Sequence, residues 1–171
     1  VNSVAFTADG TMLLSGSSDR TVRVWDVQSG QCVRVIQGYG FYFFAVAWSP
    51  DGQRLLSANS DATLTLWSAA DGMALQTLHG HTHTVYAAAW SPDGQWLASG
   101  GYDQTIRIWD ATTTVCVRII QAHTDRWCRV AWSPDSRSLA SMSRDQTVCV
   151  WDVASGACRW VGQGRLSSPC R

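Results

Sequence analysis

Short runs of alternating apolar and polar residues follow one another along the chain. In the segment TIRIW at 105–109, isoleucine alternates with polar residues up to the final tryptophan, which is the period of a β-strand with one buried face. Comparable runs recur about every ten residues, and residues that favour turns separate them. For this unit the pattern predicts four strands, a to d, at 86–90, 96–100, 105–109 and 115–120.

The pattern as a whole repeats with a period of 42 residues. Adding or subtracting this period from the strands above predicts the strands of three further units. Five columns of identical or similar residues keep the period, which is too many for chance. They are Trp25, Trp67, Trp109 and Trp151; Phe6, Trp48, Trp90 and Trp132; Asp9, Asp51, Asp93 and Asp135; Ser15, Ser57, Ser99 and Ser141; and Asp19, Asp61, Asp103 and Asp145.

The segments between strands a and b have the chemistry of tight turns. The sequence SPDG at 91–94 and again at 49–52 supplies a fixed φ, a side-chain acceptor and a glycine that tolerates positive φ. Four-stranded units of about 40 to 45 residues that bury their faces by stacking on one another are typical of a β-propeller. We therefore predict an all-β fold, a β-propeller segment of four four-stranded antiparallel blades.

Several short motifs that recur in register resemble those of the WD40-repeat family. They are Gly80-His81, the turn at 91–94, Leu97-Ala98-Ser99-Gly100, Asp103 and Trp109-Asp110, and the resemblance covers nearly the whole chain. We expect a propeller segment at 1–162, with blades at 1–37, 43–79, 85–121 and 127–162, and an irregular tail at 163–171. Closed members of the family usually have seven blades. We therefore expect an open arc cut from a larger propeller, whose two uncovered end faces favour self-association, for example of two copies into an eight-bladed ring.

The resemblance also implies a hydrogen-bonded tetrad in each complete repeat: His81, Ser99, Asp103 and Trp109 in the third, and His123, Ser141, Asp145 and Trp151 in the fourth. The chemistry of these side chains supports it, because an indole only donates, a hydroxyl does both, and a neutral imidazole accepts at one nitrogen and donates from the other.

Two repeats depart from this pattern. The second has Tyr39 where His is expected, and the first begins after that position. We expect incomplete tetrads there and a softer first half of the chain, so Trp109→Phe should destabilise more than Trp67→Phe.

The family binds partners on the narrow top face of the propeller, which is formed by the d-to-a loops, the starts of strands a and the b-to-c turns. Tyr, Phe and Arg, which are enriched at interface hot spots, are frequent at these positions. For Phe44 and Tyr86 the alternative is that they simply pack against neighbouring blades. The candidate positions are Tyr42, Phe44, Ser60, Thr84, Tyr86, Tyr102, Arg126, Cys128 and Arg144, with Asn2 and Ser18 in the first repeat.

Charge argues against two classes of partner. The chain has 13 Arg and 13 Asp with no Lys or Glu, so its net charge is zero. Binding of nucleic acid or of an anionic membrane relies on clustered positive charge, and no apolar run approaches the roughly 20 residues that span a bilayer. We expect no nucleic acid and no membrane, and we predict other proteins or peptides as partners.

Catalysis is the main rival class of function. A Ser-His-Asp triad needs an accessible nucleophile and an oxyanion hole, whereas the serine of each tetrad lies in mid-strand beneath a tryptophan donor. A sialidase-like propeller would need a glycine that the turn SDRT at 18–21 lacks, and the chain has no Glu to act as acid or base. We predict a protein that is not an enzyme and needs no cofactor.

Histidine and cysteine give two further candidates. His79, His81 and His83 alternate, as in some zinc sites, but His81 already belongs to a tetrad, so we expect no metal. The six cysteines form no Cys-x-x-Cys, and three of them, Cys32, Cys116 and Cys158, share one repeat position on successive blades. We interpret them as free thiols in a reducing compartment, which favours the cytoplasm.

These observations converge on a non-enzymatic scaffold for protein–protein interaction, a WD-repeat module of a larger protein such as those used in signalling. The alternative is a lectin-like or small-ligand-binding propeller, which would need the same polar and aromatic pocket in every blade. The candidate positions instead differ from repeat to repeat, which favours one asymmetric protein partner.

Overall fold

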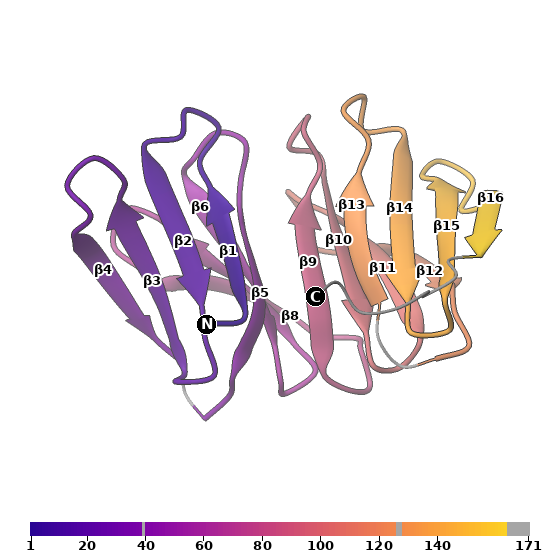
Figure 1. Ribbon diagram of the computed structural model, residues 1–171, viewed down its shortest axis with the longest axis horizontal. Helices are drawn as coiled ribbons and strands as arrows, with labels where there is room; N and C mark the ends of the chain where they lie inside the picture. Colours follow the sequence, from indigo (N-terminus) through magenta and orange to yellow (C-terminus); the bar gives the residue numbers. More distant parts are fainter. Residues whose placement is uncertain (39, 126–127, 164–171) are drawn as a thin grey trace, which may run out of the picture.

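The chain folds into four antiparallel sheets, each built from four consecutive strands (Figure 1). The computed structural model describes residues 1–38, 40–125 and 128–163, and these contain no helix long and apolar enough to cross a membrane. The strands are β1 (Ser3–Phe6), β2 (Met12–Gly16), β3 (Thr21–Asp26) and β4 (Cys32–Gln37) in blade 1; β5 (Phe43–Trp48), β6 (Arg54–Asn59), β7 (Leu64–Ser68) and β8 (Ala74–Leu78) in blade 2; β9 (Val85–Trp90), β10 (Trp96–Gly101), β11 (Thr105–Asp110) and β12 (Cys116–Gln121) in blade 3; and β13 (Cys128–Trp132), β14 (Ser138–Ser143), β15 (Thr147–Asp152) and β16 (Cys158–Gln163) in blade 4.

The strands agree with the alternating sequence pattern to within about a residue at each end, and the all-β blade architecture expected from the repeat is confirmed. The last strand runs through Gln163, one residue beyond the expected end of the repeat segment. The rest of the expected tail lies outside the described residues.

A register shift recurs between strands c and d. In blade 3 it falls between Ile108 and Trp109, and in blade 2 between Leu66 and Trp67. A bulge of this kind bends the strand locally and re-aims the side chain beside it. In every blade the shift comes directly before the repeated tryptophan, whose side chain enters the polar network of that blade.

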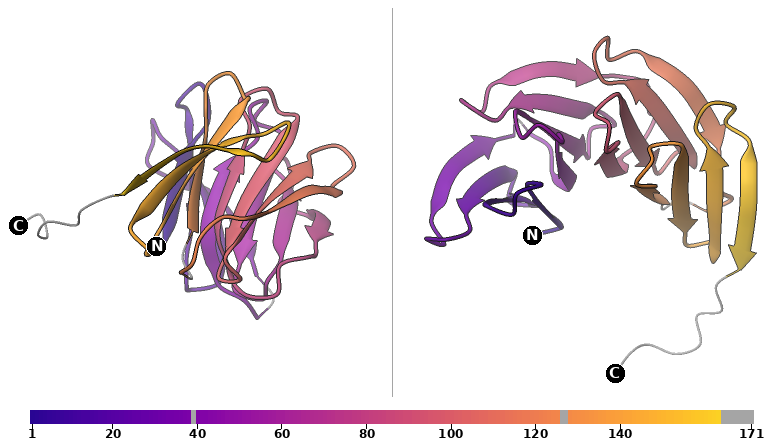
Figure 2. Two further views of the ribbon diagram at one scale, coloured as in Figure 1. Left: turned by 90° about the vertical axis from the view of Figure 1, so that its right-hand side faces the viewer. Right: turned by 90° about the horizontal axis from the view of Figure 1, so that it is seen from above.

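The blades fan out along an open arc, with strand a of each blade on the inside and strand d on the outside (Figure 2). Three hydrophobic clusters hold the arc, and each joins two neighbouring blades. Leu14 of blade 1, for example, packs with Phe43 and Leu55 of blade 2, and all three are buried. Because no sheet covers both of its own faces, this packing between blades is the main source of stability.

The two ends of the arc each present a face that no other blade covers. In blade 1, Val4 and Phe6 are 59% and 60% exposed, whereas Val46, the counterpart of Val4 in blade 2, is 4% exposed. In blade 4, Val148 and Val150 are partly exposed, although their counterparts in blade 3 are buried against blade 4. The described residues therefore form the open arc that the sequence led us to expect.

Two ends of the blades carry the connections. We call the end with the d-to-a loops and the b-to-c turns the top face, and it lies along the lower edge of Figure 1. The opposite end, with the a-to-b and c-to-d turns, is the bottom face.

Candidate functional site

The polar network of blade 3 lies directly beneath the top face. The Trp109 indole donates to Ser99 Oγ over 2.9 Å, and His81 Nε2 lies 2.8 Å from the same oxygen. His81 Nδ1 lies 2.8 Å from Asp103 Oδ2. A neutral imidazole that accepts from Ser99 and donates to Asp103 gives each of the four side chains a partner in this network. The predicted tetrad residues are thus brought together in this blade.

Asp103 anchors the network to the top-face turns. Burial alone would raise the pKa of this carboxyl, but hydrogen bonds from His81, Thr105 and the Thr82 backbone N–H hold its pKa well below the usual range. The Thr82 bond, at 3.0 Å, ties the d-to-a loop to the b-to-c turn. The carboxylate therefore fixes the two segments from which the top face is built.

Blade 4 repeats the arrangement. Trp151 donates to Ser141 over 2.8 Å, and His123 Nε2 lies 2.8 Å from the same hydroxyl. His123 Nδ1 lies 3.1 Å from Asp145 Oδ2, which also accepts from the Thr124 backbone N–H. The second predicted tetrad is therefore assembled as well.

Blade 2 replaces the missing histidine with an asparagine from its own strand b. Trp67 donates to Ser57 Oγ over 2.9 Å, and Ser57 donates to Asn59 Oδ1 over 2.8 Å. The Asn59 amide, which is fully buried, donates to the hydroxyls of Thr63 and Thr65. The tetrad of this blade lacks its histidine, as the sequence indicates, but Asn59 supplies both an acceptor and a donor and closes a different network. Tyr39 itself lies outside the described residues.

Steric room distinguishes blade 3 from blade 2, whereas blade 4 holds His123 beside Ser143, where the strand pairing has no register shift. The residue of blade 3 at the position of Asn59 is Gly101, and a Cβ there would lie 2.5 Å from His81 Nδ1. The column reads Ser17, Asn59, Gly101 and Ser143, so comparison of this column is the signal that could have identified Asn59. In blade 1 the network is the shortest: Trp25 donates to Ser15, while Arg23 pairs with Asp19.

Aromatic side chains form a continuous row over the top of blades 2 and 3. The ring centroids of Phe44 and Tyr86 lie 4.8 Å apart, those of Tyr86 and Tyr102 6.1 Å, and those of Tyr102 and His83 6.0 Å. We call these four residues the aromatic row. Phe44 and Tyr86 do pack across the blade boundary, yet both stay partly exposed, as does Tyr102. His83 is exposed, and sequence reasoning had considered it only as a metal ligand.

The remaining top-face candidates divide into four groups. Ser60 and Thr84 connect the loops by hydrogen bonds: Ser60 Oγ accepts from the Tyr42 backbone N–H, and Thr84 donates to the Ser60 carbonyl. Tyr42 is 42% exposed and lies against Arg20, and Arg144 is exposed on blade 4. Arg126 lies outside the described residues, as does the side chain of Cys128. In blade 1, Asn2 donates to Ser18 and to the Phe43 carbonyl of blade 2.

Of the histidines and cysteines considered as metal ligands or disulfide partners, His81 belongs to a hydrogen-bond network and the described cysteines are free thiols. His81 uses both ring nitrogens in its network, and across the described ranges no three His, Cys or Asp side chains gather as a metal site would require. The described thiols of Cys32, Cys116, Cys149 and Cys158 are free, and burial raises the pKa of Cys149.

Comparison with known proteins decides the family. The WD40 family model (WD domain, G-beta repeat) matches residues 1–26, 30–68, 72–110 and 114–152. The chain belongs to the WD40 repeat family. The WD40 matches fall in all four blades, so the family assignment rests on the whole array.

Individual relatives of this WD40 chain match over about one repeat. WD repeat-containing protein 18 is 56% identical over 36 residues in Homo sapiens, which is 21% of this chain and 8% of that protein. The Danio rerio protein of the same name is 55% identical over 40 residues, covering 23% and 9%. Cell division control protein 4 of Saccharomyces cerevisiae is 56% identical over 32 residues, covering 19% and 4%. The matched segments thus span less than a tenth of each relative.

Membership of the WD40 family supports the coarse function. WD40 repeats generally mediate protein–protein interactions, and WD40 proteins are generally non-enzymatic scaffolds. The repeated Ser, His and Asp of this chain agree with that role, because each serine accepts an indole N–H inside a blade and is buried.

Proposed function

We propose that this WD40 array is a scaffold that binds one protein partner through its top face. The observation that carries the proposal is the aromatic row of Phe44, Tyr86, Tyr102 and His83, which crosses from blade 2 to blade 3. Aromatic rings give large contact area with few rotatable bonds to order, so an exposed cluster of them suits an interface core.

The asymmetry of the top face supports a protein partner rather than a repeated small ligand. The aromatic row is confined to two blades, whereas blade 4 offers the exposed guanidinium of Arg144 and blade 1 a pair of small polar residues, Asn2 and Ser18. A glycan or small-molecule propeller would present similar pockets between successive blades. An arrangement that differs from blade to blade instead fits one extended protein surface.

The underlying networks make this face rigid. Asp103 and Asp145 each accept a hydrogen bond from the backbone of the d-to-a loop that leads into the same blade, at Thr82 and Thr124. A preorganised surface loses little entropy when a partner binds. The tetrads therefore serve the interface by holding its loops in place.

Peptides selected from a random displayed library on the wild-type chain give the test. We expect Tyr102→Ala or Arg144→Ala to weaken the selected peptides by about 1 to 2 kcal/mol, with little change in the melting transition. Arg137→Ala is the matched control, because Arg137 is an exposed arginine of the same blade on the bottom face. Loss of binding with Arg137→Ala but not with the two top-face variants would place the interface on the bottom face.

A further inference from the structure

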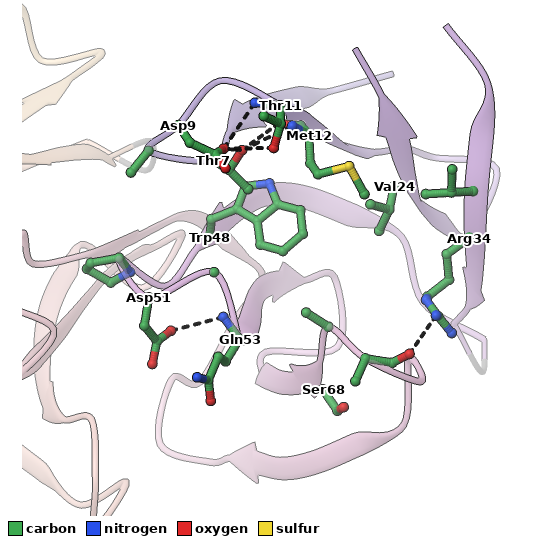
Figure 3. A pocket seen from close by; sticks show the side chains of 16 residues that line it. Thr7, Asp9, Thr11, Met12, Val24, Arg34, Trp48, Asp51, Gln53 and Ser68 are labelled. Atoms are coloured by element: carbon green, nitrogen blue, oxygen red, sulfur yellow. Dashed lines mark hydrogen bonds between the residues drawn. The ribbon is translucent and has the colours of Figure 1, made fainter. Parts of the chain in front are cut away.

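A cleft of about 920 Å³ opens on the bottom face between blades 1 and 2 (Figure 3). The side chains of Met12 and Trp48 form its floor, and the a-to-b turns of the two blades form part of its rim, with Asp9 on one and Asp51 on the other. Arg34 also lines the cleft, where it donates to the Ala70 carbonyl.

The boundary between blades 2 and 3 shows which side chain fills the equivalent position there. At the same repeat position as Met12, blade 2 carries Arg54, whose guanidinium carbon lies 4.9 Å from the ring centroid of Trp90. Arg54 Nη1 also donates to the Ala111 carbonyl of blade 3 over 3.2 Å. The guanidinium of Arg54 is therefore bound between the repeated tryptophan and a carbonyl of the neighbouring blade.

The cleft between blades 1 and 2 has the same receptors, with Met12 in place of Arg54; Arg34, which also lines it, comes from strand d of blade 1 and is engaged with the Ala70 carbonyl. Trp48 stands at the repeat position of Trp90, and Ala69, which lines the cleft, stands at that of Ala111. Met12 covers Trp48 less completely than Arg54 covers Trp90, since Trp48 is partly exposed while Trp90 is 7% exposed. A tryptophan face that remains accessible is the preferred partner of a guanidinium.

Two carboxylates, Asp9 and Asp51, outnumber the one arginine, Arg34, among the described residues that line the cleft and add charge complementarity. Hydrogen bonds from Thr7 and Thr11 lower the pKa of Asp9 to about 2, and hydrogen bonds from Ser49 and Gln53 lower that of Asp51, so both are ionised at neutral pH. The hydrogen bonds that Asp9 and Asp51 accept from described residues all fall on Oδ1. Neither Oδ2 accepts a hydrogen bond from a described residue, although the charge of Arg54 also lowers the pKa of Asp51.

We propose that the cleft between blades 1 and 2 binds an arginine side chain of a protein partner. The guanidinium stacks on Trp48, donates to the Ala69 carbonyl as Arg54 does to Ala111, and lies within the field of Asp9 and Asp51. This site is on the face opposite to the aromatic row, so it is independent of the top-face interface. Arginine is favoured over lysine because a planar guanidinium can stack and donate at the same time.

The probe for the test is the capped tripeptide acetyl-Gly-Arg-Gly-amide, titrated into the full 171-residue chain while the indole N–H resonances are followed by NMR. Trp48→Phe assigns the resonance of Trp48. We expect a saturable shift of that resonance with the arginine probe, and binding about tenfold weaker or more with the neutral citrulline analogue.

Three variants separate the site from general charge effects. Met12→Arg should fill the cleft as Arg54 fills its neighbour and weaken the probe about tenfold or more, whereas Met73→Arg adds the same charge at an exposed bottom-face position outside the cleft and should change affinity less than about twofold. Arg54→Met should open a second site, seen as a new saturable shift at Trp90.

Asp51→Asn keeps the turn acceptor and removes the charge, so it tests the site even if Met12→Arg fails to fold; we expect binding about threefold weaker or more. Undiminished binding by Met12→Arg or by Asp51→Asn, equal binding of the citrulline probe, or shifts confined to the top face would overturn the proposal. Because the probe site and the aromatic row are on opposite faces, loss of one leaves the other testable.

Discussion

At the scale of single residues, the four blades share the same tryptophan donor but differ in the residue to which the serine is hydrogen-bonded next. The repeated tryptophan donates to a strand-b serine in each blade, but the serine meets His81 in blade 3 and Asn59 in blade 2. Removing one member of such a buried network leaves its neighbours with unpaired polar atoms. What matters for stability is therefore whether the chain of bonds is closed, whichever residue closes it.

This leads to a prediction that replaces the one drawn from sequence. Trp67→Phe and Trp109→Phe should each lower the free energy of unfolding by about 1 to 3 kcal/mol, because each removes the indole donor from a buried serine of a closed network. Trp25→Phe should cost less, since Trp25 is partly exposed and its network is shorter. Denaturant unfolding of the three variants measures this. A clearly smaller loss for Trp67 than for Trp109 would show that Asn59 does not replace the histidine.

Sequence reasoning could predict the network only where it matched a familiar pattern. His81 and His123 are recognisable because each precedes the serine of its network, Ser99 or Ser141, by the same number of residues. The role of Asn59 depends on the three-dimensional room beside the strand-b serine, and the spacing of residues along the sequence does not reveal that room. The partnership of His83 with Tyr102 likewise arises from the loop geometry over blade 3.

At the scale of elements, glycine serves two different purposes in strands and turns. Gly52, in the a-to-b turn of blade 2, has φ +68°, and a Cβ there would meet nothing within 4 Å. Gly101, at the end of β10, serves the opposite purpose in blade 3, because a Cβ there would lie 2.5 Å from His81 Nδ1 and 2.6 Å from Asp103 Oδ1. The first requirement is conformational and the second is steric.

Alanine substitutions should separate these two causes. Gly52→Ala should cost about 1 to 2 kcal/mol, the penalty of a left-handed conformation for an L-residue. Gly101→Ala should cost more in the wild type, because it displaces His81 from its network. In a His81→Ala background the cost of Gly101→Ala should fall while that of Gly52→Ala stays the same, as a double-mutant cycle by denaturant melts would show. Equal costs of Gly101→Ala in both backgrounds would rule out the steric explanation.

The elements themselves were the most predictable part of the fold. Period-two runs and Asx-type turns specify a four-stranded sheet from local sequence alone, and the 42-residue repeat multiplies the evidence. The bulge before Trp109 was not predicted, since a one-residue register shift leaves the apolar pattern of β11 unchanged. Contacts between blades, such as Arg54 on Trp90, also depend on how neighbouring sheets approach each other.

At the scale of the whole molecule, the end faces of the arc are copies of surfaces that the interior buries. Val4 and Phe6 stand at the positions of Val46 and Trp48, which pack against blade 1. Val148 and Val150 stand at the positions of Ile106 and Ile108, which pack against blade 4. By repetition, the end face of blade 4 is shaped to receive the end face of blade 1.

Association of the isolated chain should therefore join unlike ends. We expect the 171-residue chain to associate with rising micromolar concentration in light scattering, and Phe6→Asp or Met142→Asp, each on one end face, to yield monomers. Ile119→Asp is the control, because Ile119 is equally exposed but lies on the outer strand of an internal blade. Mixing the two end-face variants should restore dimers, because each retains the face that the other has lost. If the mixture stays monomeric, or if Ile119→Asp dissociates the chain as well as Phe6→Asp does, the contact is not the head-to-tail repeat of the internal interface.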